Sequence, residues 1–75
     1  MAPLDDPILQ LTALKIELRQ TEGLRDDTLK ASDDPTAQAP RQHYLANAAA
    51  FERRAATIRA EIADLEAQLR LSRGR

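Results

Sequence analysis

The sequence lacks several residue types on which catalytic and metal-binding sites are often built. Among its 75 residues there is no cysteine, and His43 is the only histidine. Disulfide bonds and thiolate metal sites are therefore excluded. No apolar run approaches the ~18 residues of a membrane-spanning helix. The chain starts MAPLDD, which is acidic where a signal peptide would be basic, and this predicts a soluble, cytoplasmic chain with no cleaved signal.

Glycine and aromatic residues are also scarce. Glycine occurs twice, and Tyr44 and Phe51 are the only aromatic residues. A β-sheet protein would need more aromatic and β-branched residues, whereas the abundant Ala, Leu, Arg, Glu, Asp and Gln are typical of long helices. The composition therefore predicts a single all-α domain. A chain of this length can barely bury a sufficient core, and oligomerisation or a partner commonly supplies the missing burial.

The tripeptide Asp-Asp-Pro occurs twice, at residues 5–7 and 33–35. Asp is a preferred N-cap of helices, and Pro suits the first helical position, where its missing N–H is not needed. Both copies are interpreted as helix starts, with Asp6 and Asp34 as caps. Because Pro40 would break a helix that began at Pro35, we expect a short turn before the second helix. The predicted domain has helix 1 at about 7–30, a turn at about 31–40 and helix 2 at about 41–72.

The second helix carries the clearest periodic signal. Apolar residues follow alternating spacings of four and three, as at the a and d positions of a coiled coil: Tyr44, Ala48, Phe51, Ala55, Ile58, Ile62, Leu65 and Leu69. If helix 1 folds back antiparallel, contacting residues have numbers of constant sum. The sum 73 brings large apolar residues of helix 1 opposite five of these positions: Leu4, Ile8, Leu11, Leu18 and Leu29. This agreement predicts an antiparallel two-helix coiled-coil hairpin.

The same pairing puts Lys15, Glu22 and Arg25 opposite apolar residues of helix 2. The predicted contact is therefore imperfect in its middle, where Leu14 and Thr21 could rotate in. The two halves of the chain also differ in charge. Residues 1–40 have eight acidic and four basic side chains, net −4, and residues 41–75 have four acidic and seven basic ones, net +3. The two helices should attract each other.

Each predicted helix has a second apolar stripe that one hairpin cannot bury. Small residues let another helix approach closely, although alanine is also the best helix former and such positions can simply face water. We expect these stripes to bind a protein partner or a second copy, giving a homodimer or a larger helical bundle. The predicted partner-binding residues are Leu9, Ile16, Leu45, Ala49, Ala56, Ala60, Ala63 and Ala67.

Catalysis and metal binding find no support in the sequence. His43 has no evident orienting acid, and the paired carboxylates lack the inward-facing Glu-x-x-His pattern of helical metal sites. We therefore expect no enzyme activity, no cofactor, no metal and no small-molecule substrate.

The alternative function is a small nucleic-acid-binding regulator that uses the arginine-rich second helix and tail. Its binding residues would be Arg53, Arg54, Arg59, Arg70 and Arg73. Phosphate binding needs such a cationic face. The overall acidity, with a pI of about 5.7, and the scarcity of aromatics for stacking on bases favour the protein-binding hypothesis.

The segment DDPTAQAPRQHYLANAAAFE, about twenty residues, resembles the second-helix entry of small helical-hairpin co-chaperones of type III secretion needle subunits. In that family a loop proline is followed closely by Gln and an aromatic residue, here Pro40, Gln42 and Tyr44. This chain has an extra residue between Gln42 and Tyr44, and an arginine-rich tail. The resemblance implies a partner-stabilising, adaptor or co-chaperone role through apolar helix faces, without a cofactor.

Overall fold

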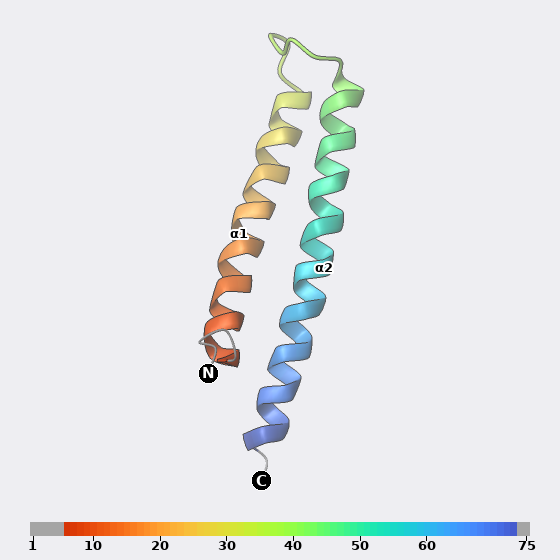
Figure 1. Cartoon of the computed structure of the whole chain (residues 1–75). Coiled ribbons are helices and arrows are strands. Elements are labelled where there is room, and N and C mark those ends of the chain that lie inside the picture. The colour runs from red at the N-terminus through yellow and green to blue at the C-terminus, as the bar shows by residue number, and fades with distance from the viewer. Residues whose placement is uncertain (1–5, 74–75) are drawn as a thin grey trace.

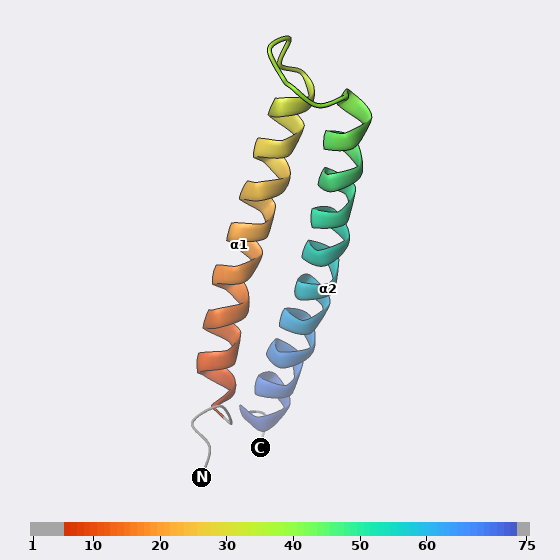
Figure 2. The ribbon, with the colours of Figure 1, turned by 45° about the horizontal axis from the view of Figure 1, so that its top comes forward.

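The computed structural model describes residues 6–73, and it is an antiparallel pair of helices joined by one turn (Figures 1 and 2). Helix α1 is Pro7–Ser32 and helix α2 is Arg41–Arg73. The expected all-α helical hairpin is therefore confirmed. Leu4, which was expected to pack at the open end, lies outside the described residues, as does the side chain of Arg73.

Helix α1 begins as its sequence predicts. The Asp6 carboxylate accepts a hydrogen bond from the backbone N–H of Ile8 at 2.9 Å, and Pro7 occupies the first helical position. This cap satisfies one of the N–H groups that a helix start leaves without a partner. The first DDP is thus a helix start.

The second DDP lies in the turn rather than at the start of α2. Asp34 accepts hydrogen bonds from the backbone N–H and the hydroxyl of Thr36, at 2.8 and 2.7 Å. These bonds lower the pKa of the Asp34 carboxyl below its ordinary value. Asp34 therefore caps the turn around Pro35, and α2 begins after Pro40, which cannot lie inside a regular helix.

The α2 side of the helix contact is the one that the heptad pattern predicts. Ala48, Ala55, Ile58 and Ile62 are buried, and Ile58 is fully buried. The other four predicted positions are half-buried: Tyr44, Phe51, Leu65 and Leu69. The spacing of apolar residues along α2 was therefore sufficient to identify its packed face.

The α1 side differs from the prediction by a partial rotation of the helix. Seven of its buried and half-buried positions also alternate by three and four: Leu11, Leu14, Leu18, Thr21, Arg25, Thr28 and Ser32. The expected contacts of Ile8, Lys15 and Leu29 were wrong, because these side chains are exposed. The rotation of Leu14 and Thr21 into the contact is confirmed.

Charge explains why the rotated arrangement is preferred. The predicted one would bury Lys15 and Glu22 against apolar side chains, and a buried charge without a partner is costly. In the rotated arrangement, buried Thr21 donates its hydroxyl hydrogen to the carbonyl oxygen of Glu17 at 2.8 Å. Likewise, buried Ser32 donates to the carbonyl oxygen of Leu29 at 2.6 Å. The hydroxyl groups of both buried polar residues thus find their hydrogen-bond acceptors within α1.

Candidate protein-binding faces

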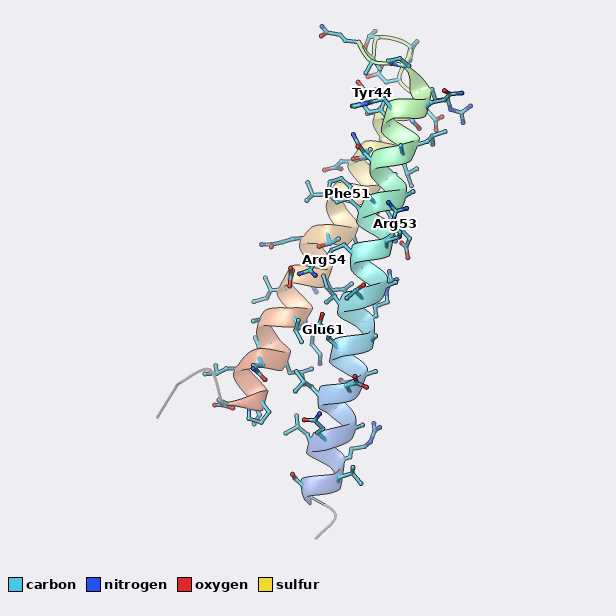
Figure 3. The ribbon with its side chains drawn as sticks, turned by 45° about the vertical axis from the view of Figure 1, so that its right-hand side comes forward. Tyr44, Phe51, Arg53, Arg54 and Glu61 are labelled. Atoms are coloured by element: carbon cyan, nitrogen blue, oxygen red, sulfur yellow. The ribbon has the colours of Figure 1, made fainter. Side chains whose placement is uncertain are left out.

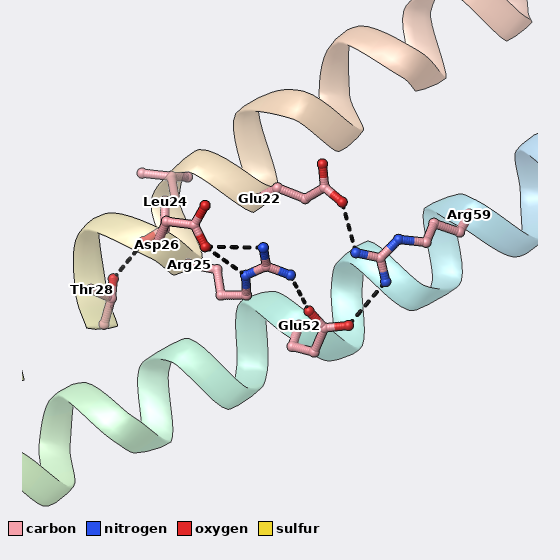
Figure 4. Close-up of polar contacts among 7 residues, drawn as sticks. All are labelled: Glu22, Leu24, Arg25, Asp26, Thr28, Glu52 and Arg59. Carbon is pink, nitrogen blue, oxygen red and sulfur yellow. Dashed lines mark hydrogen bonds and ion pairs between the residues drawn. The ribbon is translucent and has the colours of Figure 1, made fainter. Parts of the chain in front are cut away.

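One edge of the helix contact carries a network of charged side chains, shown in Figure 4. Arg59 of α2 bonds to Glu22 of α1 at 2.7 Å and to Glu52 at 2.9 Å. Arg25 of α1 bonds to Glu52 and, at 3.0 Å, to Asp26. We call these five residues the ion-pair network. Their alternating charges bridge the two helices along this edge.

The network shifts the pKa values of Glu52, Arg25 and Arg59. Hydrogen bonds from Arg59 and Arg25 hold the pKa of the Glu52 carboxyl below its ordinary value. The pKa of Arg59 is raised, chiefly by its hydrogen bonds to Glu22 and Glu52. On the opposite edge, Glu17 accepts from Arg54 at 2.6 Å and raises the pKa of that arginine. Two ion pairs between the helices thus join an acid of α1 to an arginine of α2, as the charge difference between the halves of the chain predicts. Two others have the opposite polarity, because Arg25 and Lys15 of α1 pair with Glu52 and Glu66 of α2.

The α1 outer face is the exposed stripe of Leu9, Ile16 and Leu24. Their exposed fractions are 59%, 55% and 51%. They lie seven or eight residues apart, which is about two helical turns, so they share one side of α1. Leu9 is nine residues from the packed Leu18, or about two and a half turns, and therefore points away from α2.

The α2 outer face carries the other predicted binding residues. Leu45 and the alanines at 49, 56, 60 and 63 are exposed, and Ala67 is half-buried. Ala49 is nine residues from the fully buried Ile58, so this stripe lies on the side of α2 away from α1. The eight predicted residues therefore form two separate faces on opposite sides of the hairpin. One partner helix cannot contact both.

Leu71, which sequence reasoning missed, extends the α2 outer face. It is the most exposed large apolar side chain in the described residues, at 74%. It falls two residues after Leu69, outside the heptad pattern of the packed face, and this break in the pattern was the signal that could have found it. An exposed leucine there gains nothing from the hairpin itself.

Four of the five arginines of the nucleic-acid hypothesis have described side chains, and these four do not lie together on one free face. Figure 3 shows Arg53 on the far side of α2 from α1 and Arg54 between the helices. Arg54 and Arg59 already bond to carboxylates of α1. Arg53 and Arg70 are exposed. The helix pair thus uses two of the five for its own cohesion.

The hollows of the surface are open grooves. One of about 380 Å³ lies between the helices and is lined by Gln10, Ala13, Leu14, Glu61, Asp64 and Leu65. Within residues 6–73, no group of three or more His, Cys, Asp or Glu side chains is placed to hold a metal ion. His43 contacts the amide nitrogen of Asn47 at 3.3 Å.

Comparisons with known proteins give no relative from which a role could be transferred. No family model, no curated protein and no solved structure matches the chain. The resemblance to the needle-subunit co-chaperones therefore stays a prediction. Neither described helix combines the length and the apolar composition needed to cross a membrane.

Proposed function

We propose that this chain is a non-enzymatic protein-protein interaction module of the adaptor or co-chaperone type. It acts by burying its outer faces against another helical surface, either a second copy or a partner protein. The observation that carries the proposal is the contrast between a very small core and a large amount of exposed apolar surface.

The core is small in absolute terms. Only Ala48, Ala55, Ile58 and Ile62 are buried apolar residues in the described chain, and Ile58 is its only large side chain that is fully buried. Seven large apolar side chains are exposed: Ile8, Leu9, Ile16, Leu24, Leu29, Leu45 and Leu71. Burial of each such side chain contributes about 1.5–3 kcal/mol. Covering these side chains with a partner would thus add hydrophobic free energy that the isolated hairpin leaves unused.

The shape supports the same conclusion. The hairpin measures 56 × 22 × 13 Å and has a radius of gyration of 16.8 Å, where a compact domain of this length would have about 11 Å. Its accessible surface is 5880 Å², against about 4,600 Å² for a compact monomer of 8.3 kDa. The excess of roughly 1,300 Å² exceeds the ~800 Å² that one partner buries in a standard interface. Two helices make a single layer, and domains normally pack at least two.

The proposal is tested by the mass of the chain in its native setting. The chain, tagged and expressed at its natural level, is sized in a cell extract by gel filtration with light scattering. We expect a complex at least twice the mass of the hairpin. A chain that migrates as a single hairpin in the extract contradicts the proposal.

Matched variants then locate the face. Ala56→Arg with Ala63→Arg places two charges on the α2 outer face, and Leu9→Arg with Ile16→Arg does so on the α1 outer face. Asn47→Arg with Gln68→Arg adds the same charge at exposed α2 positions away from the outer face. At least one outer-face pair should reduce the complex to the hairpin mass, and the control pair should leave it unchanged. If all three pairs behave alike, the outer faces are not the binding surface.

A further inference from the structure

We infer that the α2 outer face recognises itself, so that two copies of this chain pair antiparallel through α2. This inference rests on the proposed function and names the partner of one of its two faces. It is carried by a symmetry in the order of residues along α2.

The symmetry is visible when the face is matched against its own reverse. In an antiparallel contact, the numbers of opposing residues have a constant sum. With the sum 116, Ala49 lies opposite Ala67 of the second copy, and Ala56 lies opposite Ala60. The two-fold axis then passes at the level of Ile58. Alanine therefore meets alanine on both sides of the axis, which lets two helix backbones approach closely.

The exposed leucines of α2 fit the same axis. Leu45 and Leu71 are the only large exposed apolar residues of the described α2, and each is thirteen residues from Ile58. They therefore come to the same level at the two ends of the alanine contact, in both copies. The contact from residue 45 to residue 71 spans about 39 Å at ~1.5 Å per residue. Each end of the small-residue stripe is thus closed by a pair of large apolar side chains.

Charge complementarity supplies the second, independent support. Arg53 and Asp64 are exposed on the same edge of the α2 outer face, and neither forms an ion pair within residues 6–73. Their numbers sum to 117, so Arg53 lies level with Asp64 of the second copy on the same edge of the pair. Ala63 of the second copy lies directly opposite Arg53, and its small side chain leaves room for the arginine. The two-fold axis creates this ion pair twice.

Charge repulsion at the other edge of the α2 outer face does not prevent the two copies from pairing. Glu52 and Glu66 come close to each other across the axis, but both already bond to cations of their own chain. Glu52 is bonded to Arg25 and Arg59, and Glu66 pairs with Lys15 at 3.5 Å. Their charges are thus compensated before the second copy arrives. The α1 outer face also carries large apolar side chains, namely Leu9, Ile16 and Leu24. When it is matched antiparallel against a second copy of itself, however, opposite charges do not come to the same level.

The orientation can be read by disulfide cross-linking, because the natural chain has no cysteine. Ala49→Cys and Ala67→Cys are made as two separate full-length variants, one with a size tag. A disulfide requires the two Cβ atoms to come within about 4 Å. We expect a cross-linked species only in the mixture of the two variants, because Ala49 and its own copy would be about 27 Å apart along the axis. Cross-linking of each variant with itself, and none between them, means a parallel pair and overturns the inference.

The ion pair is tested by charge reversal at two positions that form no ion pair within residues 6–73. Arg53→Glu and Asp64→Arg should each weaken dimerisation of the purified chain about tenfold, measured by sedimentation equilibrium. The double variant should return to within about threefold of the original dissociation constant, because both ion pairs are re-formed with reversed charge. Circular dichroism checks that helicity is unchanged in all three. A double variant no tighter than the singles overturns the pairing.

The outcomes separate this inference from the proposed function. If the purified chain is a monomer while the extract contains a larger complex, the interaction module stands and its partner is a different protein. If the purified chain dimerises without the mixed cross-link, association stands and the α2 register is wrong. A single hairpin in both preparations removes both proposals together.

Discussion

Arg25 of α1 bonds to Glu52 of α2 from a position in the packed face of its helix, where the other positions hold leucine, threonine or serine. Its side chain is 25% exposed, so it is neither fully solvated nor buried. The guanidinium reaches the edge of the contact and joins the ion-pair network (Figure 4). A charged residue is thus tolerated in the contact because the hairpin is only one layer thick.

The network gives the hairpin a defined response to acid. The pKa of Glu52 is lowered in the folded chain, so the folded state binds fewer protons than the unfolded state in acid. The stabilisation from Glu52 is therefore complete above the ordinary carboxyl pKa of about 4 and is lost as the pH falls through the lower folded value. We expect the urea midpoint to fall between pH 5 and pH 3. Glu52→Gln should have a lower midpoint than the original chain at pH 7 and a smaller change with pH. Asp27→Asn, at an exposed carboxyl outside the network, is the control, and equal pH slopes for the two variants would contradict the assignment.

A matched pair of isoleucines tests the rotation of α1. Ile58 is fully buried, whereas Ile8, which the sequence pattern placed in the contact, is 57% exposed. Ile58→Ala removes buried methyl groups and leaves a cavity, so we expect a loss of about 2–5 kcal/mol of unfolding free energy. Ile8→Ala should cost less than about 1 kcal/mol. Urea denaturation at low protein concentration measures both. Equal losses would place Ile8 in the packed face after all.

Gly23 offers a stabilising substitution. It lies within α1, its backbone dihedral φ is not positive, and a Cβ built on it meets nothing within 4 Å. Glycine inside a helix is destabilising relative to alanine because the unfolded chain has more conformational freedom. Gly23→Ala should therefore raise the unfolding free energy by about 1 kcal/mol, which urea denaturation measures. An unchanged or reduced unfolding free energy would mean that a Cβ at this position meets a neighbouring group that is absent from the single hairpin, such as a second copy of the chain.

The α2 outer face should tolerate charge in the isolated hairpin. Ala56 and Ala63 are exposed, so Ala56→Arg with Ala63→Arg creates no clash inside the fold. We expect far-ultraviolet circular dichroism to show helicity within about a tenth of the original value at low protein concentration. Light scattering of the purified chain should show that association is lost. Retention of the associated mass by this double variant would show that the interface lies elsewhere.

Some of the structure followed directly from local patterns. The cap and proline at Asp6-Pro7 predict the start of α1 because they satisfy a requirement of the helix terminus itself. The apolar residues of α2 identify its packed face because they form one continuous heptad series. The turn followed from Pro40, which cannot continue a helix from Pro35. In each case the information lies within a few neighbouring residues.

The packed face of α1 could not be read in the same way. Helix α1 has overlapping stripes, and both Ile8 and Leu14 are apolar residues in reasonable positions. The choice depends on whether Lys15 and Glu22 can reach partners at the edge, and those partners are Glu66 and Arg59 of α2. The spacing of residues in the sequence does not show whether these side chains come close enough to form ion pairs.

The division of the predicted binding residues into two faces has the same origin. Leu9 and Ala56 both belong to a second stripe of their helix, and the sequence alone placed them in one set. Packing α1 against α2 turns these stripes to opposite sides of the hairpin.

By itself, the sequence determined that the chain forms two helices, where they begin and which side of α2 is apolar, because these properties depend on neighbours in the chain. Only the tertiary structure decided the rotation of α1, the ion pairs across the helices and the exposure of Leu71. Those features depend on which side chains from distant parts of the chain can meet, and on the cost of burying a charge that meets none.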